Sequence, residues 1–300
     1  MPQLEADFVS TQSSLFDEPA AVRTEGMPVL KGQLLKWIGN KQKFGAEICG
    51  YFPQDFGTYY EPFLGSGGVL ATLAPKRAVC GDAFKPLVEI WQKLHDDTDG
   101  LIHWYAERHA LIESMGSKEA AYKFVLDRYN TQGPNGADLL FLSRVCYGGV
   151  VRFRKDGYMS TPCGPHKPMP PRNFAERARI WAARTRGATF QHGDFEQTVA
   201  TAKAGDLVYC DPPYFPLTET SNFTQYSSKS GFGLDMQEKL AVAAAECAKR
   251  GAVVLISNHD TGACKKLYNE VVARPKFKGV TVEFDYFPVP RDRKSTRLNS

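Results

Sequence analysis

The sequence predicts an α/β fold in which a parallel sheet is interrupted by a helical and hairpin insert. Strand patterns alternate with helix patterns near both ends of the chain, and such alternation indicates parallel strands joined by crossover helices. The stretch between them, residues 85–147, carries mostly helical patterns such as PLVEIWQKLHDD and GADLLFLSRVCY. One sheet built from two separate parts of the chain accounts for both observations.

The first part of the predicted sheet begins after a polar segment. Residues 1–27 have no periodicity and are predicted to form a flexible arm. TYYEPFLG, at residues 58–65, is predicted to be a strand that ends in glycines, and VLATLA then continues as a helix. RAVCGD, at residues 77–82, is a second short strand that ends on an acid.

The insert ends with a hairpin and a basic helix, and the second part of the sheet follows them. GGVVRFRKDGYMSTP, at residues 148–162, is typical of a hairpin with Asp156 and Gly157 in its turn. RNFAERARIWAART is a basic helix. Strand and helix patterns then alternate again in ATFQHGDF, DLVYCD, LDMQEKLAVAAAECAKR, AVVLISN and DTGACKKLYNEVV. Residues 290–300 have no apolar pattern and are predicted to be a tail.

Composition is typical of a soluble globular protein. Hydrophobic residues make up 43% of the chain and charged residues 23%. No apolar run approaches the roughly 18 residues of a membrane span, and the N-terminus lacks a basic-then-apolar signal pattern. The seven cysteines are scattered without zinc-like spacing, which favours a reducing cytoplasm over a disulfide framework. We therefore expect a cytoplasmic protein with no membrane association and no metal.

The first motif that carries chemistry is EPFLGSGG, at residues 61–68, between a strand and a helix. Its glycines permit a tight turn and the close approach of a ligand to the backbone. It has neither a Walker lysine nor the spacing of a dinucleotide site. Asp82 ends the next strand, where doubly wound sheets commonly bind ribose hydroxyls. These features indicate a nucleoside ligand without a pyrophosphate, and a plain strand-to-helix turn is the alternative.

The second motif is DLVYCDPPYFP, at residues 206–216. Its first half suits a central strand. Pro212 and Pro213 cannot continue that strand because proline has no backbone N–H to donate. The chain therefore stops in a stiff loop that presents Asp211 and Tyr214, and such a costly arrangement indicates a functional site.

With EPFLGSGG before the insert and DPPY after it, the chain resembles the Dam-type (alpha-group) DNA adenine methyltransferases that use S-adenosylmethionine, over roughly residues 30 to 270. KWIGNK, NFTQY and ISNHDT match further stretches of that family in the same order. The resemblance implies a Rossmann-like methyltransferase sheet with an inserted helical plus β-hairpin DNA-recognition domain. Residues 28–90 and 188–289 would form the catalytic domain, and residues 91–187 the recognition domain.

The resemblance also implies which residues bind the methyl donor, S-adenosyl-L-methionine. Lys41 and Trp37 would lie near its methionine part, Asp82 would hold the ribose, and Asp194 with Phe195 would hold the adenine ring. The expected donor-site residues are Trp37, Lys41, Phe63, Gly65, Gly67, Asp82, Asp194, Phe195 and Asp211. Taken alone, Trp37 would be read as a buried aromatic and Lys41 as a solvent-exposed helix charge.

The implied catalytic residues are Asp211, Pro212, Pro213 and Tyr214. An adenine amino group is a poor nucleophile because its lone pair is delocalised into the ring. Asp211 and the carbonyl of Pro212 can accept hydrogen bonds from its two N–H groups, which favours a pyramidal nitrogen, while Tyr214 stacks on the base. Methyl transfer then depends on positioning and electrostatics, and a base within a duplex has to be flipped out to reach the site.

The insert resembles the DNA-recognition domain of the same family, and SRVCYGGVVRFRKDGYMSTPCG aligns with it without gaps. Tyr147 is implied to wedge into the base stack. Arg152 is implied to read a guanine, whose two major-groove acceptors suit a guanidinium fork; without the resemblance it would equally be a hairpin surface charge. The expected DNA contacts are Lys36, Tyr147, Val150, Arg152 and Pro162. They favour GATC or a site containing GAT in double-stranded DNA.

The sequence also departs from the family. Gly148 and Arg154 each replace an asparagine, Phe84 stands where an asparagine usually follows the ribose acid, and the closing strand is missing after Val289. DPPY alone leaves open a cytosine-amino or RNA methyltransferase, or an inactive DNA-binding relative. The intact donor and DPPY motifs argue against the inactive relative. The hairpin is of the duplex-DNA kind, which argues against an RNA enzyme.

The polar arm contains QSSLF, Gln12–Phe16, which resembles the Q-x-x-L-F peptide by which bacterial DNA enzymes dock on the sliding clamp. A disordered peptide can place Leu15 and Phe16 in an apolar pocket while Gln12 hydrogen-bonds at its edge. We therefore expect a sliding clamp as a partner. The alternative is that Leu15 and Phe16 pack on the body of the protein.

Overall fold

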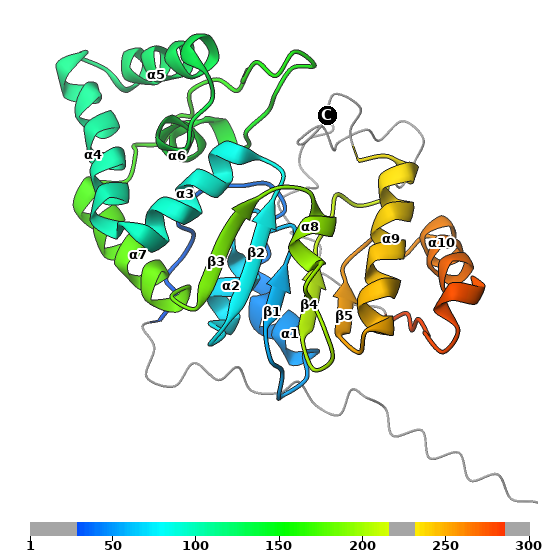
Figure 1. Cartoon of the computed structure of the whole chain (residues 1–300). Helices are drawn as coiled ribbons and strands as arrows, with labels where there is room; N and C mark the ends of the chain where they lie inside the picture. The colour runs from blue at the N-terminus through cyan, green and yellow to red at the C-terminus, as the bar shows by residue number, and fades with distance from the viewer. Residues whose placement is uncertain (1–28, 216–231, 286–300) are drawn as a thin grey trace, which may run out of the picture.

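The computed structural model describes residues 29–215 and 232–285, and a five-stranded parallel sheet forms the centre of this part (Figure 1). The strand order is β3-β2-β1-β4-β5. The strands are β1 (Tyr59–Glu61), β2 (Ala78–Asp82), β3 (Ala188–His192), β4 (Leu207–Cys210) and β5 (Val253–Ile256). β1 and β2 precede the insert and the others follow it, so the expected α/β fold is confirmed.

The central strand, β1, pairs in parallel with β2 on one side and with β4 on the other. Tyr60 lies level with Val79 of β2 and with Val208 of β4. Every residue of β1 and of β4 is buried. Burial on both faces explains why β4 is a continuous apolar run rather than an alternating one.

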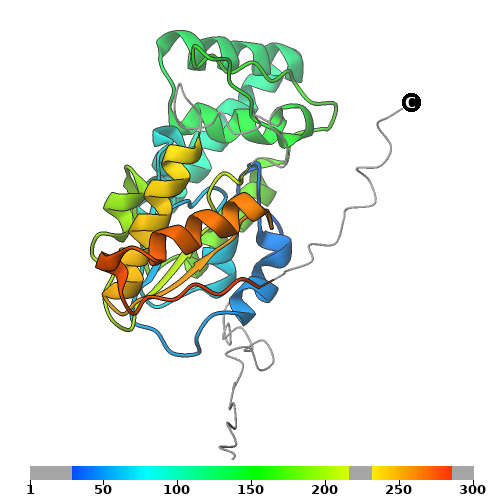
Figure 2. The same ribbon diagram turned by 90° about the vertical axis from the view of Figure 1, so that its right-hand side faces the viewer.

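Helices cover both faces of the sheet, which Figure 2 shows nearly edge-on. α8 (Phe195–Val199) and α9 (Leu234–Lys249) lie on one face, and α1 (Gly45–Gly50) and α2 (Gly68–Leu73) lie on the other. α10 (Gly262–Val272) packs against α9. The sequence did not predict α8. This helix begins after Asp194, and the Asp194 carboxylate caps it by accepting a hydrogen bond from the N–H of Glu196 at 3.0 Å.

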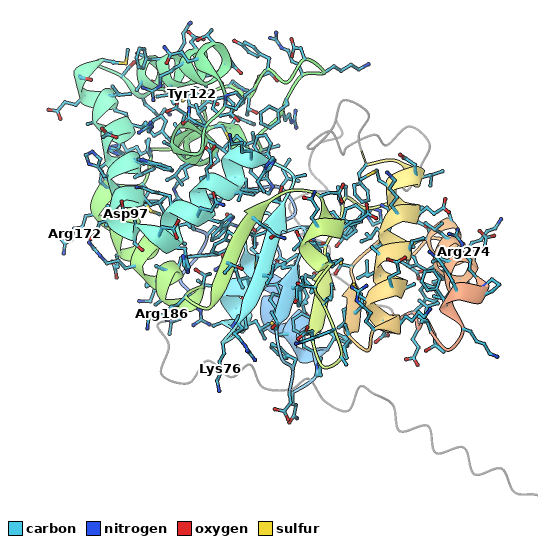
Figure 3. The ribbon with its side chains drawn as sticks, viewed as in Figure 1. Lys76, Asp97, Tyr122, Arg172, Arg186 and Arg274 are labelled. Carbon is cyan, nitrogen blue, oxygen red and sulfur yellow. The ribbon has the colours of Figure 1, made fainter. Side chains whose placement is uncertain are left out.

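The insert stands beyond the carboxyl ends of the strands (Figure 1). It contains α4 (Thr98–Ser114), α5 (Lys118–Gln132) and α6 (Gly136–Val145), and α3 (Lys85–Asp96) and α7 (Pro171–Arg184) connect it to the sheet. The expected domain division at residue 90 falls within α3, which contacts both β3 and α6. Tyr122 of α5 lies among these helices (Figure 3), and its hydroxyl donates to the carbonyl of Thr161 at 2.7 Å.

The expected hairpin is a tight turn with isolated backbone pairs in place of full strands. Phe153 pairs with Met159, and the N–H of Arg154 donates to the carbonyl of Tyr158 at 2.9 Å. Gly157, with a φ of +87°, donates its N–H to the carbonyl of Arg154 at 2.9 Å. The predicted turn is thus confirmed.

Some predictions fall on residues outside the described ranges. These are the arm with Gln12–Phe16, the NFTQY stretch at residues 222–226, Val289 and the tail at residues 290–300. Within the described ranges, no helix combines the length and the apolar character needed to cross a membrane.

A buried carboxylate holds the helices of the insert together. Asp138 of α6 is 0% exposed. It accepts hydrogen bonds from Nε of Arg108 on α4 at 2.9 Å and from Nε of Arg128 on α5 at 2.9 Å. Burial alone would raise the pKa of Asp138, but the hydrogen bonds from Arg128, Asn135 and Arg108 lower it. The ionised carboxylate therefore ties α4, α5 and α6 together.

Replacing Asp138 should destabilise the insert strongly. Asp138→Ala leaves two guanidinium groups without their buried partner, and breaking such a pair costs about 3–5 kcal/mol. The matched control is Asp127→Ala on α5, which removes an exposed ion pair with Lys123 and should cost less than about 1 kcal/mol. Denaturant titration of both variants measures the difference, and equal losses of unfolding free energy would contradict the role given to Asp138.

Candidate active site

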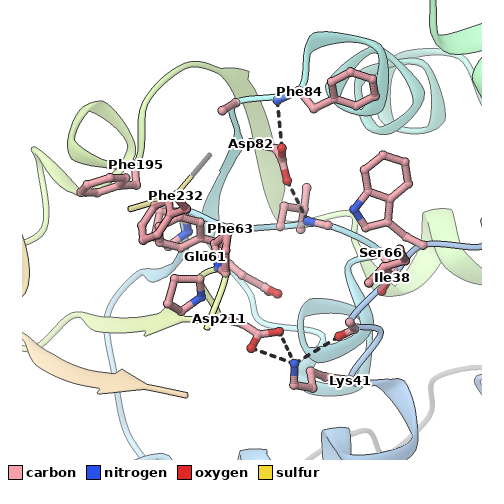
Figure 4. Close-up of a pocket in the computed structure, with 18 of the residues that line it drawn as sticks. Ile38, Lys41, Glu61, Phe63, Ser66, Asp82, Phe84, Phe195, Asp211 and Phe232 are labelled. Carbon is pink, nitrogen blue, oxygen red and sulfur yellow. Dashed lines mark hydrogen bonds and ion pairs between the residues drawn. The ribbon is translucent and has the colours of Figure 1, made fainter. Parts of the chain in front are cut away.

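A cavity of about 630 Å³ opens at the carboxyl ends of β1, β2 and β4, and Figure 4 shows it from within. Its walls come from four regions that are far apart in sequence: the segment before α1, the ends of the strands with the residues that follow them, the hairpin of the insert, and the start of α9. Ligands of open α/β sheets bind at this edge. Of the nine expected donor-site residues, Gly67 does not line it, and the other eight do: Trp37, Lys41, Phe63, Gly65, Asp82, Asp194, Phe195 and Asp211.

The glycine-rich loop shapes one wall of the cavity and fixes Asp82. Gly65 and Gly67 have φ values of +49° and +62°, in the left-handed region that favours glycine. A Cβ on Gly67 would lie 2.7 Å from the Trp91 ring. The N–H groups of Gly65 and Phe84 donate to the two carboxylate oxygens of Asp82 at 3.0 and 2.9 Å. Burial raises the pKa of Asp82, and these two hydrogen bonds oppose that rise.

Aromatic rings form a second wall. Phe63, which follows β1, stacks on Phe195 at the start of α8 with ring centroids 5.4 Å apart. Phe232 contacts Phe63 edge-on at 5.7 Å. Asp194 lies beside them as the cap of α8. The result is an apolar slot with a carboxylate at its edge, which suits a flat heterocycle that carries an amino group.

The expected catalytic acid is paired with a lysine. Nζ of Lys41 lies 2.8 and 2.6 Å from the two carboxylate oxygens of Asp211 (Figure 4). The same ammonium group lies 4.9 Å from the centre of the Tyr214 ring. Burial raises the pKa of Asp211, and Lys41 opposes that rise. Sequence reasoning placed Lys41 beside the donor and gave no sign of this contact with Asp211.

Glu61, the last residue of β1, is a site residue that sequence reasoning missed. Its carboxyl lines the cavity, is 3% exposed and accepts a hydrogen bond from the hydroxyl of Tyr59 at 2.9 Å. The pKa of Glu61 is raised to about 8: burial raises it most, the hydrogen bond from Tyr59 lowers it, and the charge of Asp211 raises it. The signal available in the sequence was an acid at the end of a strand that leads into glycines.

The hairpin reaches the same cavity with only part of its expected DNA contacts. Val150 and Arg152 line the cavity. Tyr147 is 62% exposed, and its N–H donates to the carbonyl of the exposed Pro162 at 2.8 Å, so both lie on the outer surface of the insert. Lys36 is also outside the cavity wall, next to Gly149. The structure thus places two of the expected contacts, Val150 and Arg152, in the cavity wall and the other three outside it.

Phe84 and Phe153 are further wall residues whose part sequence reasoning did not predict. Phe84 stacks on Trp37 with centroids 5.6 Å apart and contacts Phe153 of the hairpin at 5.3 Å. Phe84 therefore links the Trp37 side of the cavity to the hairpin. Within residues 29–215 and 232–285, no three His, Cys, Asp or Glu side chains gather into a group that could hold a metal ion.

Known proteins resemble the chain along most of its length. It is 33% identical over 238 residues to a DNA adenine methylase of Vibrio cholerae, a match that covers 78% of this chain and 83% of that protein. It is 30% identical over 285 residues to the DNA adenine methylase of Haemophilus influenzae. This match covers 89% of this chain and 92% of that protein. A type II methyltransferase of Lactococcus lactis is 26% identical over 247 residues. This match covers 78% of this chain and 84% of that protein.

A family profile gives the same result. The profile described as D12 class N6 adenine-specific DNA methyltransferase matches residues 37–282, from the Trp37 wall of the cavity to beyond α10. The match therefore includes both halves of the sheet and the insert between them. With this much of its length matched, the chain belongs to the D12 class of N6 adenine-specific DNA methyltransferases.

Proposed function

We propose that this enzyme moves the methyl group of S-adenosyl-L-methionine to the exocyclic amino group of an adenine flipped out of duplex DNA, at GATC or a site containing GAT. One observation carries the proposal: a single cavity is lined both by the expected donor-site residues and by Asp211 to Tyr214. The family match favours adenine over the cytosine and RNA alternatives that DPPY leaves open.

The cavity fits the proposed donor in size and in chemistry. Its volume of about 630 Å³ lies within the range of pockets that hold such ligands. Asp82 can accept hydrogen bonds from ribose hydroxyls, and the slot beside Phe63 and Phe195 suits the adenine ring. Lys41 offers a positive charge for the carboxylate of the methionine part, and the buried Glu61 carboxyl can accept a hydrogen bond from its ammonium group. The donor supplies an electrophilic methyl group, and these residues fix where that group lies.

The target amino group would be held by Asp211. A carboxylate has about four lone-pair sites, so Asp211 can accept a hydrogen bond from the base while it remains paired with Lys41. The carbonyl of Pro212 is the second expected acceptor, and Tyr214 offers a ring for stacking. These groups act by orienting the nitrogen and stabilising the charge that develops on it.

Base flipping is supported by the depth of the acceptor. The Asp211 side chain is 15% exposed at the floor of the cavity. An adenine that stays stacked and paired in a duplex cannot bring its amino group to such a position, so the base has to leave the helix. The exposed ring of Tyr147 is placed on the insert surface, where a wedge into the base stack would act.

A direct assay tests the proposal. The purified enzyme is incubated with S-adenosyl-L-methionine carrying a labelled methyl group and with duplexes that contain GATC, a GAT-containing variant, or neither. Label on the adenine amino group of the GATC duplex is expected, with reduced label on the variant. Label on cytosine, or equal label on all three duplexes, would refute the proposed base or the proposed site.

Asp211→Ala should abolish methyl transfer while leaving the binding of S-adenosyl-L-methionine or of DNA partly intact. Asp211→Ala removes an acceptor that is needed most at the transition state, and loss of one such group costs about 10²–10³ in kcat. Single-turnover methylation measures the loss, and titration of the donor checks that its affinity is partly retained. The control is Asp235→Ala, an exposed carboxylate outside the cavity. If Asp211→Ala kept more than about a tenth of wild-type turnover, the assigned role would be wrong.

Arg152 should affect which sequence is methylated. Arg152→Ala should remove about 1–3 kcal/mol of discrimination at one guanine of the site. Lys155→Ala changes an exposed charge of the same hairpin that does not line the cavity. It should weaken binding evenly across sequences, as a phosphate contact does. Methylation rates on a set of singly substituted duplexes decide between them, and matching profiles for the two variants would remove Arg152 from the base-reading residues.

The arm should bind the sliding clamp through Gln12–Phe16, which lies outside the described residues. Tethering of this kind would raise the concentration of the enzyme at newly made DNA. A fluorescent peptide of residues 7–20 is titrated with clamp, and a Kd no weaker than about 100 μM is expected. Binding should vanish when Leu15 and Phe16 are both changed to alanine. A peptide that stays unbound at millimolar clamp would end the proposal.

A further inference from the structure

We infer that Gln237 is a positioning residue for the catalytic loop, residues 211–215 after β4; the inference rests on the proposed function. Gln237 lies in the first turn of α9 and is 1% exposed. Its Nε2 donates to the carbonyl of Pro213 at 2.7 Å, and its Oε1 accepts from Nδ2 of Asn258 at 3.3 Å. Both ends of a buried amide are therefore used to join α9, the catalytic loop and the segment after β5.

The segment after β5 holds the other end of the loop. Oδ1 of Asn258 accepts hydrogen bonds from the N–H groups of Phe215 and His259, both at 2.9 Å. Nδ1 of His259 donates to the carbonyl of Phe215 at 2.5 Å. The His259 ring also meets the Tyr214 ring edge-on, with centroids 4.9 Å apart. The loop is thus held on both sides of Tyr214.

The two prolines explain why one amide has so much influence. Proline fixes φ near −65°, so the soft backbone dihedrals of Pro212 and Pro213 are their ψ angles. The hydrogen bond from Gln237 fixes the direction of the Pro213 carbonyl and therefore its ψ angle. Asn258 then fixes the peptide that leads into Phe215. Few degrees of freedom remain for the Pro212 carbonyl and Tyr214, the groups that are expected to orient the target base.

Loss of this bond should reduce the rate of methyl transfer and leave binding nearly unchanged. Gln237 does not line the cavity, so its replacement removes no contact to either substrate. A catalytic group displaced by about 1 Å can cost about 10² in rate. In Gln237→Leu, which cannot donate to Pro213, we expect kcat to fall at least about tenfold. The Kd values for S-adenosyl-L-methionine and for the GATC duplex should stay within about threefold of wild type.

Gln237→Glu provides a readout that a purely structural role would not move. A neutral carboxyl has one O–H donor and a carbonyl acceptor, as the amide has, whereas the ionised form has no donor. The activity of Gln237→Glu relative to wild type should therefore rise as the pH falls from about 8.5 to about 5.5, since burial raises the pKa of a carboxyl. The same ratio for Gln237→Leu should stay flat.

Gln92, an exposed residue of α3, offers a control for the loss of a side-chain hydrogen bond to a backbone carbonyl. Its Nε2 donates to the carbonyl of Phe190 at 2.9 Å, the same type of bond, and it does not line the cavity. Gln92→Leu and Gln92→Glu should keep wild-type kcat at every pH. Circular dichroism at each pH measures the folded fraction of every variant, by which the rates are divided.

Two results would overturn the inference: a wild-type kcat in Gln237→Leu, or an activity ratio for Gln237→Glu that does not change with pH. The second remains decisive if Gln237→Leu does not fold. Failure of the proposed function would look different. In that case the wild-type enzyme itself would leave the adenine of the GATC duplex unmethylated, whereas failure of the inference alone leaves an active wild type and unaffected variants.

Discussion

The parallel pairing of β1 with β4 is the constraint on which the site depends. Tyr60 of β1 lies level with Val208 of β4, so Glu61 and Asp211 both emerge at the carboxyl edge of the sheet. Their closeness is evident in the pKa of Glu61, which Asp211 raises. The Asp211 carboxylate at this buried edge needs a cation, and Lys41 supplies it from the segment before α1. The pairing of two central strands thus determines where the charges of the active site lie.

Sequence reasoning was most successful where the information is local. The strand that ends at DPPY, the glycine-rich turn and the Asp156-Gly157 hairpin were all predicted, because proline and glycine restrict the backbone within a few residues of themselves. The family resemblance also named thirteen of the residues that line the cavity. Helix α8 was missed because its five residues are too few for a periodic pattern to be read.

What sequence could not provide were contacts between distant segments. Lys41 and Asp211 are 170 positions apart, and no pattern around either indicates that one faces the other. Glu61 was read as part of a glycine-rich turn, since only the packing around β1 shows that it is buried beside Tyr59. The place of Phe84 between Trp37 and Phe153 depends on how the insert meets the sheet. Each of these contacts follows from tertiary packing, which local sequence patterns do not predict.

The shared cavity has a consequence for how target specificity can change. Val150, Arg152 and Phe153 of the hairpin form part of the same wall as Trp37 and Phe84. A recognition module that is exchanged between relatives would therefore bring a new wall to the catalytic chamber as well as a new reading surface. Chimaeras made by grafting the insert alone would have to reproduce the packing of Phe153 against Phe84 and of Phe84 against Trp37. Under the proposed role of the hairpin, a change of specificity would therefore be easier by substitution of single side chains on a retained hairpin than by exchange of the whole insert.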